Sequence, residues 1–598
     1  MARELSSTQF DVIVIGAGIN GAGIARDAAM RGLKVLLLDK GDIGGGTSSW
    51  STRLIHGGLR YLEHGEFGLV RESLRERACL MNIAPHLVRA LPLLVPIYRN
   101  ARRGYWTIRA GMIAYDVLAF GKTLPRHRML SAAETLERAP GLRRADLLGA
   151  AVYFDAQVEY AERLVLENVL SAVEHGAAVL TYARVEKLIV ADGKACGVEF
   201  SRQSDGGVQS STSRVQRPES EPLEFKVPGR LSRGEEGGFV RALTSSEDGR
   251  PTASKDASTG RHSASAAIVI NAAGPWVDQL LQESDRRAPR LIGGTKGSHL
   301  IVAPFPGAPA TAIYVEAETD GRPFFVIPWN GQYLIGTTDI RYDGNLDHVQ
   351  IDHEEIDYLL RETNRLLPDA RLTREQILYT YSGVRPLAFT GGKDEQSITR
   401  RHFIRVDPQI QNLFSIVGGK LTTYRRLAQQ AVDLALKKLG RRPIACTTDR
   451  VPLPGAGGSV RTGSGPGSPH GQAAWGGDSD RVPLMIWDRL LRIYGKRSSL
   501  IVELLREDAS LAAVFDPETG AIAAEVVLAF RHELAQTLAD CLLRRTMVGL
   551  NSTCGLDAAE PAARIAQQYL GWSDTRRAEE VATYREEVSR RFRGQTRI

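Results

Sequence analysis

The stretch FDVIVIGAGINGAGIARDAA, residues 10–29, decides how the fold of this chain is interpreted. Its apolar start predicts a buried strand, and Gly16, Gly18 and Gly21 follow with the spacing G-x-G-x-x-G. A helix is expected over 19–31 and a second strand over 34–39, KVLLLD. This order of strand, glycine turn, helix and strand predicts a dinucleotide-binding βαβ unit, in which the helix N-terminus receives a pyrophosphate.

Asp39 ends the second predicted strand, where a carboxylate can accept hydrogen bonds from ribose hydroxyls. The glycines alone do not distinguish FAD from NAD, because both cofactors use this turn. Two later segments, INAAGPW at 270–276 and SIVGGKLTTYR at 415–425, place small residues at strand ends where a flat ring can approach.

Composition narrows the class of protein. The 598 residues predict two or three domains, and 43% hydrophobic with 24% charged residues is typical of a soluble globular protein. A formal charge of +7 favours anionic small molecules or an anionic lipid surface. We expect no nucleic-acid binding, because no basic stripe with interleaved aromatic residues is found.

The five cysteines are scattered, so they predict neither disulfides nor a metal site and fit a reducing cytosol. The segment DHVQIDHEEID at 347–357 is interpreted as a charged loop that opens a helix, and no metal is expected. No signal peptide and no apolar run long enough to span a bilayer is found.

Seven motifs carry a resemblance to a known family. They are GAGINGAGIARDAA, TSSWSTRLIHGGLRYLE, INAAGPWV, TKGSHLIV, FVIPWNGQYLIGTTD, YSGVRPL and GGKLTTYRRLA, in this order. The chain resembles the FAD-dependent, aerobic-type sn-glycerol-3-phosphate dehydrogenases over most of 10–440 and the helical tail. The resemblance implies an α/β fold with a glutathione-reductase-like, Rossmann-like FAD domain, an inserted substrate domain of mixed or antiparallel sheet, and a C-terminal all-α domain.

The expected division of the chain follows from composition and from this resemblance. The FAD domain is expected to comprise residues 1–90, 151–200, 266–285 and 411–450, and the substrate domain residues 91–150 and 286–410. We expect a disordered insertion at 201–265 and a flexible linker at 451–480. The helical domain is expected over 481–598. In the tail, Val527, Phe530, Leu534, Leu538, Cys541 and Leu542 recur at helical spacing.

The resemblance also assigns the cofactor site. Gly16, Gly18, Gly21 and Asp39 would hold the ADP half of FAD, with Thr47 and Ser48 near its pyrophosphate. The residues that would lie along the flavin are Ala273, Gly274, Pro275, Gly418, Gly419, Lys420, Leu421 and Thr422. The family usually has Glu at the position of Asp39, which is one methylene shorter.

The segment RLIHGGLRY at 53–61 can supply much of a pocket for a dianionic substrate with two hydroxyls. The resemblance assigns His56, Arg60 and Tyr61 to this pocket, and Gly57 and Gly58 are expected to let the backbone pass close to the ring. Arg385, Arg400 and Lys420 complete it: we expect Arg400 on the phosphate and Arg385 at the reacting carbon. Arg385 or Lys420 could instead stabilise negative charge on the flavin.

The implied reaction oxidises sn-glycerol 3-phosphate to dihydroxyacetone phosphate by hydride transfer from C2 to flavin N5, with electrons passed to a membrane quinone. His56 has a suitable pKa for the base, although water or phosphate could take the proton. The alternatives are an oxygen-using glycerol-3-phosphate oxidase, an amino acid oxidase-like flavoenzyme, and a non-catalytic flavin-binding subunit. The cation cluster argues against the last two.

The segment 97–120 mixes Arg with Tyr, Trp and aliphatic residues, as interfacial helices do, although core packing would use the same residues. The family resemblance implies a cytoplasmic enzyme attached peripherally to the inner face of the cell membrane. A homodimer is one alternative for the oligomeric state.

Overall fold

The computed structural model describes residues 9–62, 65–119, 124–202, 261–283, 289–391, 400–456 and 482–594. The chain begins as expected with β1 (Gln9–Ile15), the glycine turn, α2 (Ile19–Met30) and β2 (Val35–Leu38). β1 and β2 pair in parallel, and all of β2 is buried. Continuous apolar runs of this kind belong to the centre of a parallel sheet covered on both faces. The predicted βαβ unit is confirmed.

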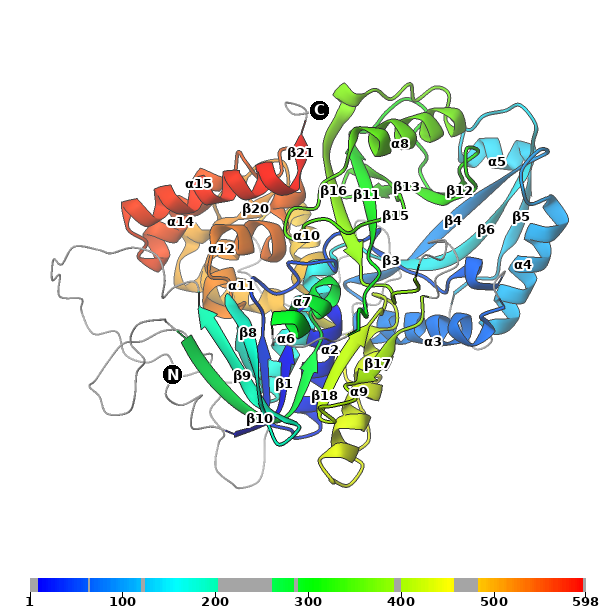
Figure 1. Ribbon diagram of the computed structural model, residues 1–598. Coiled ribbons are helices and arrows are strands. Elements are labelled where there is room, and N and C mark those ends of the chain that lie inside the picture. Colours follow the sequence, from blue (N-terminus) through cyan, green and yellow to red (C-terminus); the bar gives the residue numbers. More distant parts are fainter. Residues whose placement is uncertain are drawn as a thin grey trace, which may run out of the picture.

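The first sheet brings together strands that lie far apart in the chain (Figure 1). Its order is β17-β18-β10-β1-β2-β7, and the antiparallel β8 and β9 join it where β9 pairs with β10. The added strands are β7 (Ala178–Leu180), β8 (Ala183–Ala191), β9 (Lys194–Arg202), β10 (Arg261–Asn271), β17 (Phe403–Val406) and β18 (Leu413–Val417). β1, β2, β7, β10 and β18 run parallel, so their carboxyl ends meet at one edge.

Two apolar cores cover the two faces of this sheet. Val12 and Val14 of β1 share a core with α2, α6 (Ala161–Glu174) and α9 (Tyr424–Lys438). Ile13 and Ile15, which alternate with them, share another core with β8, β9 and α7 (Val277–Glu283). Because successive strand residues point to opposite faces, this separation of cores follows from the strand itself.

The second sheet has the order β21-β16-β11-β14-β13-β12-β4-β6-β3, with β15 paired to β11 and β5 to β6. Its strands are β3 (Leu54–Ile55), β4 (Val88–Tyr98), β5 (Arg128–Ser131), β6 (Leu147–Val158), β11 (Thr295–Val302), β12 (Ala312–Glu316), β13 (Pro323–Trp329), β14 (Gln332–Gly336), β15 (Ile340–Arg341), β16 (Ile377–Arg385) and β21 (Arg593–Gly594). All named pairs are antiparallel except β12 with β4, so the expected mixed sheet is confirmed.

Helices α3 (Phe67–Ile83), α4 (Tyr105–Leu118), α5 (Ala132–Arg138) and α8 (His353–Leu366) pack around the second sheet. Asp352 caps α8 through a reciprocal bond pattern with Glu355, which confirms that this charged loop opens a helix. At the other end of the sheet, Asn330 and Gly331 join β13 to β14 with φ of 53° and 74°. Two positive φ values are what a two-residue hairpin turn requires, and the predicted tight hairpin is confirmed.

Several strands depart from the divisions expected from the sequence. β3 lies within the expected FAD region 1–90 and β21 within the expected helical domain, yet both belong to the second sheet. β6 continues to Val158 in the second sheet, past the division expected at 150. β17 was expected within the substrate region 286–410, but it pairs with β18 in the first sheet, with Phe403 opposite Val417. Composition could not reveal this, because strand pairing rather than local residue content decides which sheet a strand joins.

The tail is mostly helical and lies at the upper left of Figure 1, above β8, with α4 at the far right of the view. Its helices are α10 (Leu484–Tyr494), α11 (Ser498–Glu507), α12 (Ala523–His532), α13 (Leu538–Asp540), α14 (Ala559–Leu570) and α15 (Asp574–Arg591). It also has a short hairpin, β19 (Val514–Asp516) with β20 (Ala521–Ile522), and β21, which pairs with β16.

The periodic run from Val527 to Leu542 is not one helix. α12 ends at His532, Leu534 takes a φ of 60°, and Thr537 caps a new helical turn. A π-helical turn then covers Cys541–Arg545. Helical spacing of apolar residues therefore predicted a buried face here but not the interruption, which places two adjacent arginines, Arg544 and Arg545, in the interior.

The expected insertion and linker lie mainly outside the described residues. The edges of the 201–265 stretch are ordered, because β9 reaches Arg202 and β10 begins at Arg261, and these two antiparallel strands pair directly. Of the 451–480 linker, only 451–456 are described. No helix within the described ranges is both long and apolar enough to cross a membrane. The same residues contain no cluster of three His, Cys, Asp or Glu side chains placed for a metal ion.

Candidate active site

The three glycines of the βα turn serve different purposes. Gly16 has a φ of 102°, and a Cβ there would lie 2.6 Å from the carbonyl oxygen of Ala272 at the end of β10. A Cβ on Gly21 would lie 1.8 Å from the carbonyl oxygen of Gly16, so Gly21 permits helix and turn to pack. At Gly18, a Cβ would meet Ser48 Oγ at 3.5 Å. Gly18 faces the cavity and leaves the N-terminus of α2 open to a ligand.

Asp39 stabilises this turn and also faces the cavity. Its Oδ2 accepts a hydrogen bond from the backbone N–H of Ala17 at 2.6 Å, and Oδ1 accepts one from Gly41 at 2.8 Å. Burial raises the pKa of Asp39, and the two backbone donors oppose that rise. Each carboxylate oxygen has a further lone pair, so a ribose hydroxyl can still donate to it.

The loop after Asp39 is tied to the glycine turn. The backbone N–H of Ile19 donates to Ser48 Oγ at 3.0 Å, which places this hydroxyl at the first turn of α2. Thr47 Oγ1 donates to the carbonyl oxygen of Val384 in β16 at 2.7 Å. Thr47 and Ser48 therefore lie where the glycine turn and the second sheet meet.

One large cavity, of about 1050 Å³, runs along the carboxyl edge of the first sheet to the second sheet. Of the residues assigned from the sequence, all but Gly21, Gly57 and Gly418 line it: Gly16, Gly18, Asp39, Thr47, Ser48, His56, Gly58, Arg60, Tyr61, Ala273, Gly274, Pro275, Arg385, Arg400, Gly419, Lys420, Leu421 and Thr422. Such a volume is at the upper end for small-molecule pockets. Motifs separated by hundreds of residues therefore converge on a single space.

The double glycine of RLIHGGLRY makes room for two tyrosines. A Cβ on Gly57 would lie 2.2 Å from Tyr115 Oη and 2.4 Å from Leu74 Cδ2. Gly58 has a φ of 80°, and a Cβ there would lie 2.1 Å from the ring of Tyr61. These close approaches to protein side chains account for both glycines, where the sequence had suggested close approach to a cofactor ring.

Asp155 is a hydrogen-bonding centre behind His56. Its Oδ1 accepts from the backbone N–H of Gly57 at 3.0 Å, from Tyr115 Oη at 2.7 Å, and from the guanidinium of Arg77. Asp155 is 1% exposed, and its Oδ2 has no hydrogen-bond partner among the described residues. The carboxylate lines the cavity, so this free oxygen is available to a ligand or to a water molecule.

His56 is held by its backbone next to the late glycine motif. Its N–H donates to Thr422 Oγ1 at 3.2 Å, which joins two motifs far apart in sequence. Burial and the nearby charge of Lys420 lower the pKa of His56 to about 4, against an opposing effect of Asp155. The imidazole is therefore neutral at pH 7, and its pKa lies below the near-neutral value that the sequence led us to expect for a base.

The two arginines expected at the substrate share one carboxylate. Arg385 Nη1 donates to Asp339 Oδ1 at 3.0 Å, and Arg400 Nη2 donates to Asp339 Oδ2 at 2.7 Å. Burial would raise the pKa of Asp339, but the two guanidinium groups outweigh it and lower that pKa. Arg400 Nη1 is buried without a hydrogen-bond partner in the described part of the chain. A buried, unused guanidinium nitrogen suits an anion.

Lys420 completes the cationic side of the cavity. Its Nζ donates to Ser73 Oγ at 2.9 Å and lies 4.5 Å from the ring centre of Tyr61. Burial lowers the pKa of Lys420 to about 7, so this ammonium titrates near neutral pH. Burial raises the pKa of Tyr61, although Arg400, Arg60 and Arg385 oppose it. Tyr61 thus stands as a neutral hydroxyl among cations.

Comparison with known proteins identifies the family. A model described as FAD dependent oxidoreductase matches residues 11–215 and 236–423, and one for the C-terminal domain of alpha-glycerophosphate oxidase matches 446–577. The chain is 42% identical over 596 residues to a glycerol-3-phosphate dehydrogenase of Synechocystis sp., covering 98% of this chain and 97% of the relative. The chain belongs to the FAD-dependent glycerol-3-phosphate dehydrogenases.

Two further comparisons agree with membership of the glycerol-3-phosphate dehydrogenase family. The aerobic glycerol-3-phosphate dehydrogenase of Bacillus subtilis is 31% identical over 556 residues, 91% of this chain and 88% of the relative. The solved glycerol-3-phosphate dehydrogenase from Bacillus halodurans complexed with FAD has a TM-score of 0.71 at 26% identity, covering 98% of this chain and 96% of that one. Glycine oxidase from Geobacillus kaustophilus, at 18% identity and a TM-score of 0.50, shares the fold.

As a member of the glycerol-3-phosphate dehydrogenase family, the chain is an oxidoreductase whose cofactor is FAD. The residues present fit that cofactor. The N-terminus of α2 is open at Gly18, the carboxylate of Asp39 faces the same cavity, and small residues also line it at Gly274 and Gly419. These features suit a pyrophosphate, a ribose and a flat ring, respectively.

Several cavity residues of this chain were not singled out from the sequence. Asp339 ends the quoted motif FVIPWNGQYLIGTTD, and Asp155 follows an apolar run in β6. Asn20 donates to the carbonyl oxygen of Gly418 at 3.3 Å and its Oδ1 is buried without a partner in the described chain. A polar residue that follows an apolar run was the signal in the sequence that could have indicated Asp155 and Asp339. This signal does not identify the side chains to which they bond.

Proposed function

We propose that the chain oxidises sn-glycerol 3-phosphate to dihydroxyacetone phosphate. The observation that carries the proposal is Arg400 Nη1, which has no hydrogen-bond partner among the described residues and belongs to a cavity lined also by Arg385, Lys420 and a neutral His56. A phosphate dianion requires several donors of this kind. The family of the chain and the names of its relatives support the choice of substrate.

Each residue has a distinct role in this proposal. Arg400, with Arg60 and Tyr61, binds the phosphate, and Arg385 orients the C2 hydroxyl. His56 accepts the hydroxyl proton, since its ring is neutral; Asp155 favours this protonation, and the charge of Lys420 opposes it. FAD, when bound, supplies the acceptor for the two electrons and the hydrogen on C2. Lys420, in its charged form, would stabilise the negative charge that the flavin gains as electrons leave the substrate.

The proposal is tested on the purified holoenzyme without oxygen. Addition of glycerol 3-phosphate should bleach the yellow flavin absorbance, while glycerol and glycine should not. Bleaching by glycine alone would favour the amino acid oxidase alternative. A spectrum unchanged by every one of these compounds would favour a flavin-binding subunit without catalysis.

We further propose a membrane quinone as electron acceptor and a peripheral position at the cytoplasmic face of the membrane. The outward face of α4 supports it: Trp106, Ile113 and Val117 are 72%, 50% and 69% exposed, while Met112 and Tyr115 face the interior. Arg102 and Arg109 are exposed beside them. An apolar helix face with flanking cations suits an anionic bilayer surface.

Re-oxidation of the reduced enzyme distinguishes the acceptors. A soluble quinone should restore the yellow colour much faster than dissolved oxygen does. Rapid re-oxidation by oxygen with formation of peroxide would instead identify an oxidase. We also propose that the chain forms a homodimer. Sedimentation equilibrium of the holoenzyme tests this proposal.

A further inference from the structure

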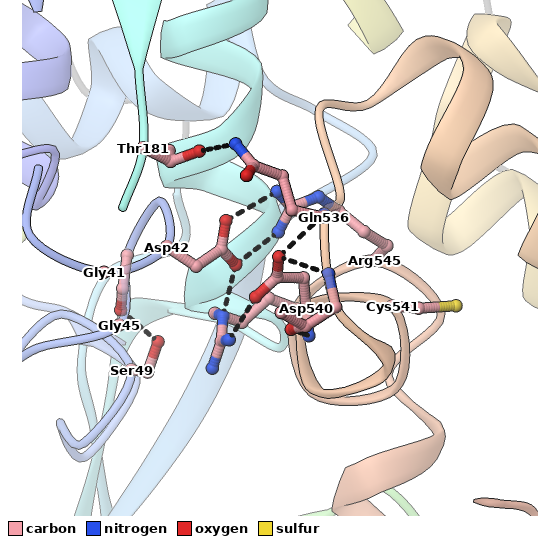
Figure 2. Close-up of polar contacts among 12 residues, drawn as sticks. Gly41, Asp42, Gly45, Ser49, Thr181, Gln536, Asp540, Cys541 and Arg545 are labelled. Carbon is pink, nitrogen blue, oxygen red and sulfur yellow. Dashed lines mark hydrogen bonds and ion pairs between the residues drawn. The ribbon is translucent and has the colours of Figure 1, made fainter. Parts of the chain in front are cut away.

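A buried ion cluster joins the tail to the loop that follows Asp39 (Figure 2). Asp42 accepts from both arginines of the π-helical turn: Arg545 Nη1 and Nη2 donate to Oδ2 and Oδ1 at 2.7 and 2.8 Å, and Arg544 Nε donates to Oδ2 at 2.5 Å. All three residues are at most 4% exposed. Burial would raise the pKa of Asp42, but Arg545 and Arg544 lower it to about 2. The carboxylate is therefore charged at neutral pH.

The arginines are themselves held within the tail. Arg544 Nη2 donates to Asp540 Oδ1 at 2.9 Å, and Arg545 Nε donates to the carbonyl oxygen of Glu533 at 2.7 Å. Neighbouring side chains on an α-helix diverge by about 100°. The π-helical turn at Cys541–Arg545 changes that geometry, and both guanidinium groups reach one carboxylate. Both guanidinium groups are thus held by the tail while they donate to Asp42.

The loop that carries Asp42 also forms one wall of the FAD cavity. Asp42, Gly45 and Thr47 line the cavity. The backbone N–H of Gly44 donates to the carbonyl oxygen of Ala17 in the glycine turn at 3.0 Å, and Ser48 Oγ accepts from Ile19 at the start of α2. A displacement of Asp42 would therefore move the groups that surround the helix N-terminus.

We propose that the C-terminal domain is part of the FAD site, because Arg544 and Arg545 hold Asp42 and thereby keep the loop after Asp39 in the shape that receives the pyrophosphate. Arg544 and Arg545 are positioning residues in this arrangement. Coupling of this kind is reciprocal, so bound FAD strengthens the docking of the tail as much as the docked tail strengthens FAD binding.

A second buried ion pair provides the matched control. Arg163 of α6 donates through Nη1 and Nη2 to Glu533 at 2.5 and 2.9 Å, and both side chains are 0% exposed. This pair also joins the tail to the rest of the chain, but its partner in the rest of the chain lies on α6 and not in the loop that carries Asp42. Arg163 Nη1 also donates to the carbonyl oxygen of Arg545 at 3.5 Å, so Arg163→Gln removes a contact to the Arg545 backbone but leaves the Asp42–Arg545 ion pair in place. A general loss of domain packing would affect variants of both pairs alike, whereas the proposed role is confined to Asp42.

The experiment measures FAD affinity by the quenching of flavin fluorescence as FAD is titrated into apoprotein. Arg545→Gln leaves the Asp42 carboxylate under-paired, and we expect the Kd for FAD to rise about tenfold to a hundredfold. Arg545→Lys retains the charge but not the two-pronged contact, and should give a smaller rise in a chain that remains folded. Arg163→Gln should lower the unfolding temperature with a Kd close to that of the parent.

A double-mutant cycle completes the test. If Asp42 and Arg545 act through one contact, Asp42→Asn with Arg545→Gln should weaken FAD binding no more than the stronger single variant does. Unchanged FAD affinity in folded Arg545→Lys, or equal loss of affinity in Arg163→Gln, would overturn the proposal. Because the readouts are FAD binding and thermal unfolding, a failure of the glycerol 3-phosphate assay leaves this result unaffected.

Discussion

Asp339 engages one side of Arg400 and leaves the other side for a ligand. Oδ2 of Asp339 accepts from Nη2 of Arg400 at 2.7 Å, while Nη1 of Arg400 is buried and unbonded within the described residues. The guanidinium is therefore oriented in advance, and binding an anion costs little further side-chain entropy.

Replacement of Arg400 tests the phosphate contact. Arg400→Gln should raise the KM for glycerol 3-phosphate about tenfold to a hundredfold, because a charged hydrogen bond is lost. Steady-state rates with a soluble quinone provide the measurement. Arg405→Gln, at an exposed arginine outside the cavity, is the control and should leave KM unchanged. Equal KM values for Arg400→Gln and the parent would remove Arg400 from the substrate site.

Replacement of His56 tests the proposed base. His56→Gln should lower kcat by about 10²- to 10⁴-fold with a small change in KM, since a general base acts on the transition state. His402→Gln is the control: His402 bonds Gln430 and lies outside the cavity, so kcat should stay at the parent level. Retention of full kcat in His56→Gln would assign the proton to water or to the substrate phosphate.

The pKa of Lys420 predicts how activity depends on pH. Its pKa of about 7 means that the ammonium is charged below pH 7 and neutral above it. If the charge is needed, kcat/KM should fall as pH rises through about 7. Lys420→Arg remains charged throughout this range and should lose that decline. The phosphate of the substrate titrates in both proteins, so only the difference between the two profiles is diagnostic.

The close packing around Gly57 predicts that a side chain at this position lowers the stability of the fold. Gly57→Ala would place a methyl group 2.2 Å from Tyr115 Oη, and overpacking of this kind costs about 1–3 kcal/mol of unfolding free energy. Thermal unfolding of the apoprotein measures it. Gly68→Ala is the matched control, because a Cβ there meets open space in the described structure and alanine favours the helix. A Gly57→Ala chain as stable as the parent would mean that Tyr115 shifts readily.

The face of α4 predicts binding to membranes. Trp106→Gln combined with Val117→Gln should weaken binding to anionic vesicles by at least about tenfold, since two large apolar side chains no longer enter the bilayer surface. Co-sedimentation with vesicles measures the partition. Phe389→Gln, at an exposed phenylalanine elsewhere, should bind as the parent does. Equal binding by the α4 variant would show that another surface attaches the enzyme.

Local signals in the sequence predicted the elements that depend on nearby residues. The βαβ unit followed from an apolar run and three glycines, and the hairpin followed from Asn330-Gly331 between two apolar strands. The assignment of β17 to the substrate sheet was wrong, since β17 pairs with β18, which belongs to the first sheet. The break after His532 was not foreseen either, because apolar spacing continues across it.

By itself, the sequence determined the dinucleotide turn, the order of its motifs and the residue types that gather at the cavity. Only the tertiary structure decided their partners: Arg400 meets Asp339 across 61 positions, and Arg545 meets Asp42 across 503. The physical reason is that turns and strands arise from interactions between near neighbours, whereas a buried charge requires whichever opposite charge the completed fold brings beside it.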